Sequence, residues 1–186
     1  MSEPADWIEA LRQCHRRRRE GGGSTLMQLA TLTADGSPAV RTVVIRDVEI
    51  DGGVLFSSDA RSRKNTEVRL DPRASGVMWF RDDAMQFRLS GRCEIVKDDK
   101  LRERVWRDKH GDKARALFAW PTPGEARAAE DAFAEAVPAE APVPATFEVL
   151  RLTPTTVETL SLDGVPHDRV VCEPDGDGWR SQRVNP

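Results

Sequence analysis

Short apolar segments separated by turn residues fill most of the chain between residues 26 and 96. They are rich in Val, Ile and Leu and bounded by Gly, Asp, Ser and Pro, which is typical of β-strands joined by hairpins. Similar segments recur near the C-terminus. The predicted strands cover residues 26–32, 39–47, 54–57, 74–81, 85–96, 147–152, 157–162, 169–172 and 179–184. So many short strands in hairpin spacing predict a mainly antiparallel barrel with peripheral helices.

Helical patterns precede the first strand and separate later ones. Trp7, Ile8, Leu11 and Cys14 recur at helical spacing, and a run of arginines followed by glycines ends that helix. Further helices are predicted over residues 62–70, 98–118 and 125–136, and a stiff Pro-rich connector over 138–144. We expect one domain over residues 1–186, comprising an N-terminal helix and Gly linker (1–23), a helical insertion with its connector (98–146) and C-terminal strands (147–186).

Composition excludes several classes of function. The length of 186 residues suits one domain with a substantial core. A formal net charge of -3 does not favour nucleic acid as a partner. No apolar run approaches ~18 residues and the N-terminus is not of the signal type, so a cytoplasmic protein without a membrane segment is expected. The cysteines and histidines are few and scattered, so neither a disulfide framework nor a metal site is predicted.

Cationic residues occur where a buried strand would normally be apolar. Arg41 and Arg46 flank the largely apolar part of one predicted strand, and Arg63 and Lys64 open the helix predicted to begin at Ser62. A buried guanidinium without a partner is costly, and positive charge at a helix N-terminus opposes the helix dipole. A bound phosphate would resolve both conflicts, because Arg, Lys, hydroxyl and main-chain N–H groups are its usual ligands. The alternatives are exposed arginines on an edge strand and ordinary surface charges in a first helical turn.

Several motifs, in this order, resemble one known family. They are Arg41-Thr42-Val43-Val44-Ile45-Arg46, Ser62-Arg63-Lys64, Asp71-Pro72, Met85-Gln86-Phe87-Arg88-Leu89-Ser90-Gly91-Arg92 and His167-Asp168-Arg169. Through their order and spacing, the chain resembles the pyridoxamine 5'-phosphate oxidase-like flavoproteins, the FMN-binding split-barrel superfamily, over nearly its whole length. Residues 89–92, 120–124 and 184–186 resemble a bacterial and cyanobacterial subgroup described only as an FMN-binding domain. The resemblance implies an antiparallel split β-barrel that forms a homodimer, with FMN in a cleft between the two subunits.

The resemblance also implies which residues bind the cofactor. Arg41, Thr42, Val43 and Val44 would run along the flavin, with Arg46 at the far end of the strand. Ser57 and Ser58 would lie near the ribityl phosphate, and Arg63 and Lys64 would bind it. Gln86 would hydrogen-bond the isoalloxazine ring, and Arg169 would approach its pyrimidine end from the partner subunit.

The last two of these residues suit the flavin ring chemically. Gln86 can donate and accept at once, which matches a ring edge with both kinds of group. A cation such as Arg169 would stabilise the negative charge of reduced flavin. The alternatives are a solvent-facing Gln86 and structural pairing of Arg169 with Asp168 or Asp163.

The pattern of the true oxidases breaks down where those enzymes bind substrate. Their substrate-gripping Arg, two residues before the histidine that aligns with His167, is replaced by Val165. Their Tyr, Arg and Ser set for the substrate phosphate has no clean counterpart between about Val105 and Trp120, and the chain contains no tyrosine. An aromatic residue that abuts the flavin is also missing near Leu160. The motifs for the cofactor are therefore present, whereas those for pyridoxamine phosphate are not.

We therefore expect an FMN-dependent oxidoreductase with an unassigned substrate, in which hydride passes between a small organic donor and the flavin. The alternatives are a genuine pyridoxamine or pyridoxine 5'-phosphate oxidase, a non-catalytic FMN-binding or redox-sensing protein, and a split barrel that uses deazaflavin or heme. The catalytic residue is not assigned. His167 is a weak candidate, because histidine titrates near neutral pH but a lone histidine in a loop is more often a surface residue.

Overall fold

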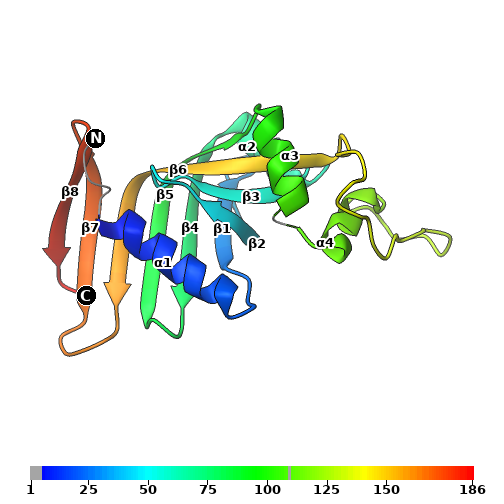
Figure 1. The fold of residues 1–186 in the computed structure, drawn as a ribbon. Coiled ribbons are helices and arrows are strands. Elements are labelled where there is room, and N and C mark those ends of the chain that lie inside the picture. The colour runs from blue at the N-terminus through cyan, green and yellow to red at the C-terminus, as the bar shows by residue number, and fades with distance from the viewer. Residues whose placement is uncertain (1–5, 109) are drawn as a thin grey trace.

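An antiparallel sheet that closes on itself forms the body of the protein. The computed structural model describes residues 6–108 and 110–186. Within them the strand order is β3-β2-β1-β4-β5-β6-β7-β8, and a further pairing of β3 with β6 closes the first six strands into a barrel (Figure 1). All pairings are antiparallel, so the predicted mainly β split barrel is confirmed. The strands are β1 (Leu26–Leu32), β2 (Pro38–Val48), β3 (Val54–Asp59), β4 (Arg73–Phe80), β5 (Met85–Ile95), β6 (Phe147–Ser161), β7 (Asp168–Asp175) and β8 (Gly178–Val184).

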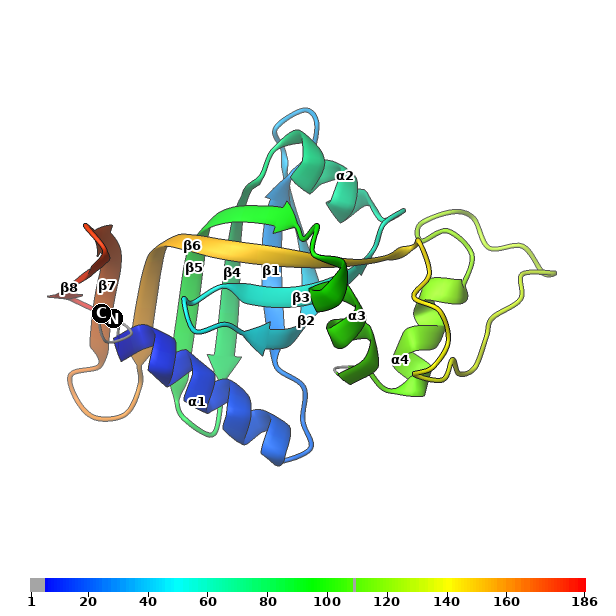
Figure 2. The same cartoon turned by 45° about the horizontal axis from the view of Figure 1, so that its top comes forward.

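Strand β6 is a single element where the sequence predicts two. Its first half pairs with β3, its second half pairs with β7, and both halves pair with β5. Pro154, within the gap between the two predicted strands, lies opposite Gly91 at a shift of the β5–β6 register, where a missing N–H donor is tolerated. A Cβ on Gly91 would lie 2.1 Å from the main-chain oxygen of Thr153, so only glycine fits there. These residues let one strand curve from the barrel into the β7–β8 extension (Figure 2).

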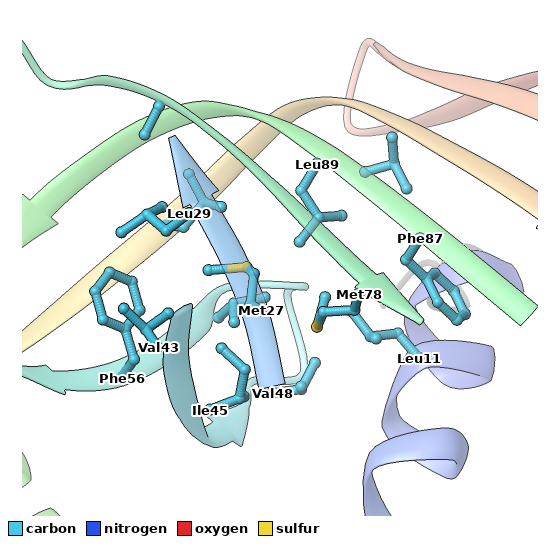
Figure 3. Close-up of a cluster of buried hydrophobic side chains, with 14 of the residues drawn as sticks. Leu11, Met27, Leu29, Val43, Ile45, Val48, Phe56, Met78, Phe87 and Leu89 are labelled. Carbon is cyan, nitrogen blue, oxygen red and sulfur yellow. The ribbon is translucent and has the colours of Figure 1, made fainter. Parts of the chain in front are cut away.

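Alternate side chains of the barrel strands fill its interior. Figure 3 shows this cluster, to which β1, β2, β3, β4 and β5 contribute Met27, Leu29, Val43, Ile45, Val48, Phe56, Met78, Phe87 and Leu89. Leu11 enters the same cluster from helix α1 (Asp6–Glu20) and is fully buried. The predicted apolar face of this helix is confirmed, because Trp7, Ile8 and Cys14 are also buried. Each large apolar side chain buried in this way contributes about 2 kcal/mol.

The helices after the barrel hairpins differ from the prediction. Helix α2 (Arg63–Leu70) lies where it is expected, but the helix expected over 98–118 is divided into α3 (Asp99–Asp108), α4 (Asp112–Ala116) and a 3-10 turn, η1 (Leu117–Ala119). A continuous helix would use the last α3 carbonyls for main-chain hydrogen bonds. Here the Val105 carbonyl instead accepts from His110 Nδ1 at 2.9 Å, and the Trp106 carbonyl accepts from Arg115 Nη1 at 3.2 Å. Side chains thus end α3 early.

The helix predicted over 125–136 is wrong, because this segment contains turns without regular structure. Its residues are largely exposed, and a short helix without an apolar face to bury is marginal in water even when rich in alanine. The Asp131 carboxylate accepts from the main-chain N–H of Ala128, and the Ala134 carbonyl accepts from Trp120 Nε1 at 2.8 Å. Both contacts hold the backbone in another conformation.

We call residues 110–146 the arm. In both ribbon views the arm, which includes α4, lies beside the barrel on the side away from β7 and β8 (Figures 1 and 2). Buried Arg115 holds it by donating to the carbonyls of Trp106, His110 and Val137. Arg102 on α3 donates to the carbonyls of Pro144 and Phe147. Side-chain hydrogen bonds therefore hold the part of the arm that has no regular structure. No helix in the described part of the chain is long and apolar enough to cross a membrane.

Candidate functional site

A cavity of about 480 Å³ lies between one wall of the barrel and the arm. This volume is in the range of small-molecule and cofactor sites. The barrel wall consists of Thr42, Val43, Val44, Arg46, Ser57, Ser58, Asp59 and Lys64. The arm supplies the opposite wall from residues 114–133. Of the predicted cofactor residues, the fold therefore brings Thr42, Val43, Val44, Arg46, Ser57, Ser58 and Lys64 to one cavity.

A β-bulge positions Arg46 on this wall. Ile45 pairs with Phe56 and Asp47 pairs with Leu55, so Arg46 is the extra residue between two consecutive partners on β3. Such a bulge re-aims a side chain and occurs commonly beside functional sites. Burial, and secondarily the charge of Arg19, lower the pKa of Arg46 to about 10, so the guanidinium remains cationic at neutral pH.

Ser57 connects Arg46 to a buried histidine. Arg46 Nε donates to Ser57 Oγ at 3.2 Å, and His110 Nε2 lies 2.8 Å from the same hydroxyl. The other ring nitrogen, Nδ1, is 2.9 Å from the carbonyl oxygen of Val105. Burial and the nearby Arg46 charge lower the pKa of His110 to about 4, so the ring is neutral at physiological pH. We call Arg46, Ser57 and His110 the relay.

Lys64 brings a second cation to the cavity, near the start of α2. It is half-buried, and its ammonium group donates to Ser62 Oγ at 2.9 Å. Burial, with a smaller contribution from the Arg41 charge, lowers the pKa of Lys64. Within residues 6–108 and 110–186 no carboxylate forms an ion pair with it. Such a cation facing a cavity is suited to an anionic ligand.

The neighbouring hydroxyl, Ser58, belongs to a buried polar cluster. Its Oγ donates to Asn65 Oδ1 and lies 3.2 Å from Ser62 Oγ. The Asn65 amide in turn donates to the Glu148 carboxylate. Asn65 thereby connects helix α2 to strand β3 through Ser58 and to strand β6 through Glu148.

Two of the predicted phosphate and flavin ligands lie outside the cavity lining. Arg41 is directed to α2, where its guanidinium contacts a Glu67 carboxylate oxygen at 2.5 Å and donates to Thr31. Arg63 is exposed and has no hydrogen bond or ion pair with another described residue. The positive charge of Arg41 nevertheless acts on Lys64. The roles given to Arg41 and Arg63 stay predictions.

The remaining predicted residues lie on other parts of the fold. Gln86 is half-buried on β5, opposite Leu160 on β6. Arg169 on β7 forms an ion pair at 2.6 Å with Glu158, not with the acidic residues considered as alternatives. His167 is exposed and borders a separate hollow near the C-terminus. Strand β7 lies across the barrel from the arm (Figure 1), and none of these three side chains lines the cavity.

The arm wall is mainly apolar and aromatic. The Trp120 and Phe133 rings meet edge to face, with centroids 5.3 Å apart, and the Arg127 guanidinium lies 4.7 Å from the Phe133 centroid. Arg61, which forms an ion pair with Asp59 at 2.7 Å, also donates to the Trp120 carbonyl at 2.9 Å. The hydrogen bond from Arg61 to Trp120 therefore ties the arm to the barrel wall at the edge of the cavity.

Sequence reasoning did not identify His110 as part of the site. The contact between His110 and Ser57 spans 53 positions in the chain, and no local pattern indicates it. Parts of the arm were likewise predicted to be helical, and none of its residues was assigned to the cofactor site.

Comparison with known proteins identifies the family. Residues 4–97 match the family described as pyridoxamine 5'-phosphate oxidase, FMN-binding domain. The chain is 32% identical over 176 residues to pyridoxine/pyridoxamine 5'-phosphate oxidase 2 of Arabidopsis thaliana, covering 88% of both proteins. It is 30% identical over 196 residues to dihydrophenazinedicarboxylate synthase of Pseudomonas chlororaphis, covering 98% of this chain and 85% of the relative.

A solved structure extends the similarity to the fold. It is the crystal structure of a pyridoxamine 5'-phosphate oxidase-related, FMN binding protein from Nostoc punctiforme, with a TM-score of 0.85 and 30% identity over 100% of both chains. The predicted resemblance is confirmed by sequence and by fold. The chain with the cavity between β2, β3 and the arm belongs to the pyridoxamine 5'-phosphate oxidase-like, FMN-binding family.

Proposed function

We propose that the protein binds FMN in the cavity between the barrel and the arm and acts as a flavin-dependent oxidoreductase with an unassigned small organic substrate. The observation that carries the proposal is Lys64, a half-buried cation that faces the cavity without a carboxylate ion pair among the described residues. A phosphate group supplies the negative charge that such a cation requires. Bound FMN would supply hydride acceptance, and the protein would bind and orient it.

The rest of the cavity fits the same ligand. Apolar side chains such as Val44, Leu117 and Phe118 offer surface for an aromatic ring system. Arg46 adds a second positive charge on the barrel wall. A ligand that is both aromatic and anionic, as FMN is, matches both kinds of lining.

We further propose that the functional unit is a homodimer with FMN between subunits. Gln86 and Arg169 lie on the outer surface of β5 and β7, on the far side of the barrel from the arm. Trp79, paired with Gln86 in the β4–β5 ladder, is 47% exposed on this surface. A second copy packed on this face would cover Trp79 and would add Arg169 to the cavity of its partner. The three buried cysteines are free thiols, which agrees with a cytoplasmic location.

The substrate differs from pyridoxamine phosphate in this proposal. Relatives of the chain are named as oxidases of pyridoxine and pyridoxamine 5'-phosphate, and another is named as a dihydrophenazinedicarboxylate synthase. Val165, at the position where the resemblance implies a substrate-binding Arg, is 96% exposed and has no charge to offer. Aerobic assays for pyridoxal 5'-phosphate formation from pyridoxamine 5'-phosphate test this point, and efficient turnover would contradict it.

Titration of the apoprotein with FMN tests the cofactor. We expect flavin absorbance bands and one FMN per subunit. Loss of a charged hydrogen bond in Lys64→Ala should weaken binding by about tenfold or more. Lys100→Ala, on the exposed surface of α3, is the matched control and should bind as the parent does. A correctly folded protein that remains colourless and ignores FMN would refute the proposal.

Mixing two defective variants tests the shared site. Lys64→Ala and Arg169→Ala homodimers should each bind FMN weakly. A mixed dimer, isolated with two affinity tags, contains one site in which Lys64 and Arg169 from different subunits are both intact. We expect one strong FMN site per mixed dimer. If Arg169 acted on the cavity of its own subunit, mixing would restore no site. If Arg169 had no role in binding, the Arg169→Ala homodimer would itself bind FMN as the parent does, and either result would contradict the shared site.

A further inference from the structure

The hydrogen bonds of the relay determine where each hydrogen lies. A carbonyl oxygen can only accept, so His110 Nδ1, 2.9 Å from the Val105 carbonyl, carries the ring hydrogen. The buried ring is neutral near physiological pH, so Nε2 has only a lone pair. Ser57 Oγ, 2.8 Å from Nε2, must therefore donate its single hydrogen to His110.

Ser57 then has only lone pairs for its other contacts. The Arg46 Nε–H group donates to one of them at 3.2 Å, which agrees with this assignment. Because Ser57 also lines the cavity, its oxygen presents an acceptor there. A fully ionised phosphate group has acceptors only, so it cannot form a hydrogen bond with this oxygen.

Ser58 is restricted in a similar way. The Asn65 amide donates through Nδ2 to the Glu148 carboxylate, which directs Asn65 Oδ1 toward Ser58. The Ser58 hydroxyl hydrogen is used in that contact. Near the start of α2, Lys64 also lines the cavity, and unlike Ser58 its side chain still has hydrogens to donate to an anion.

We propose that His110 is a positioning residue that makes Ser57 a hydrogen-bond acceptor toward the cavity, so that Ser57 recognises a donor in the non-phosphate part of the bound flavin and leaves the phosphate to Lys64. This assignment rests on the proposed function for the identity of the ligand, and it differs from the phosphate role that the family resemblance implies for Ser57. The ribityl hydroxyls of FMN are donors of the required kind.

Nuclear magnetic resonance of protein labelled with ¹⁵N-histidine tests the positioning role without any ligand. The chain has three histidines, and the His15→Gln and His167→Gln variants identify the His110 signals by elimination. We expect the Nδ1 nitrogen to carry the hydrogen and Nε2 to be unprotonated at neutral pH. A hydrogen on Nε2 would overturn the proposal, because Ser57 would then accept from His110 and could donate to a phosphate.

Comparison of FMN with riboflavin, which lacks the phosphate, tests the recognition. Ser57→Ala should lower the affinities for FMN and for riboflavin by a similar factor of about five, so the preference for FMN should not change. Lys64→Ala should reduce that preference by about tenfold. A selective loss of FMN affinity in Ser57→Ala would overturn the proposal. A parent protein that binds neither flavin would refute the proposed function, and the His110 tautomer would still decide the positioning role.

A double-mutant cycle tests whether His110 acts through Ser57. His110→Phe keeps an aromatic ring beside Phe118 and Phe147 but removes the acceptor for Ser57. We expect it to weaken riboflavin binding in the parent background and to have no further effect in Ser57→Ala. Equal losses in both backgrounds would contradict the proposal. Should His110→Phe not fold, the tautomer measurement on the parent protein decides the question.

Discussion

Acidification should destabilise the folded apoprotein through protonation of His110. This effect should begin at a higher pH than the destabilisation caused by protonating the carboxylates whose pKa values are lowered. Burial and the Arg46 charge lower the pKa of His110 from 6.5 to about 4. Below pH 6.5 the unfolded chain therefore binds a proton that the folded chain does not. The free energy of unfolding falls with decreasing pH, by up to about 1.4 kcal/mol per pH unit and about 3 kcal/mol in total at pH 4. This destabilisation by His110 is complete below its pKa in the folded protein, about 4, and is absent above pH 6.5.

Urea unfolding of the apoprotein at several pH values across this window measures the effect. His110→Gln cannot titrate, so its stability should depend on pH less steeply by the stated amount. His167→Gln removes an exposed histidine and is the matched control, which should retain the steep dependence. Asp71, whose pKa is lowered to about 2 mainly by hydrogen bonds from Arg73, destabilises the fold only below 3.8 and leaves the window undisturbed. Identical pH dependence in the parent and His110→Gln would refute the reasoning.

Three further predictions concern packing and thiol chemistry. Gly91→Ala should lower the free energy of unfolding by about 2 kcal/mol or more, because its Cβ would clash with the main chain of β6; Gly111→Ala, where the Cβ meets no atom within 4 Å, is the control. Arg115→Ala should destabilise the protein by about 3 kcal/mol and make the arm sensitive to protease, since three carbonyls lose a buried donor. Arg107→Ala, which removes an exposed pair with a neighbouring glutamate, should change stability by about 0.5 kcal/mol or less, and equal effects of the two substitutions would contradict this account. Burial raises the pKa of Cys93 to about 12, so a thiol reagent should label it only after unfolding, and rapid labelling of the native protein at neutral pH would contradict the buried site.

The strands could be predicted because their signals are local. Alternating apolar residues and turn residues are read over a few positions, and β1, β3 and β8 begin within one residue of their predicted starts. Strand β6 was predicted as two strands, and its continuity at Pro154 depends on Gly91 in another strand. The 125–136 segment was wrongly assigned because alanine favours a helix locally, whereas a helix needs a partner surface that the sequence does not reveal.

The cavity was predictable where its residues belong to a recognisable motif. Arg46 and Lys64 were selected because cations are unusual beside buried strands, and both line the cavity. The contact of Arg41 with Glu67 could not be foreseen, since the carboxylate comes from a different element. His110 and the aromatic arm meet the barrel only in the folded chain, so composition and spacing gave no indication of them.

The insertion between β5 and β6 leaves the barrel and returns to it at the same place. Val96, directly after β5, donates its main-chain N–H to Val149 near the start of β6 at 2.8 Å, so the two ends of the insertion are held together by the sheet. Its length and sequence can consequently change during evolution without altering strand pairing, because surface connections tolerate such changes. One wall of the cavity can therefore diversify while the opposite wall is inherited intact, which gives a single scaffold a route to new chemical specificities.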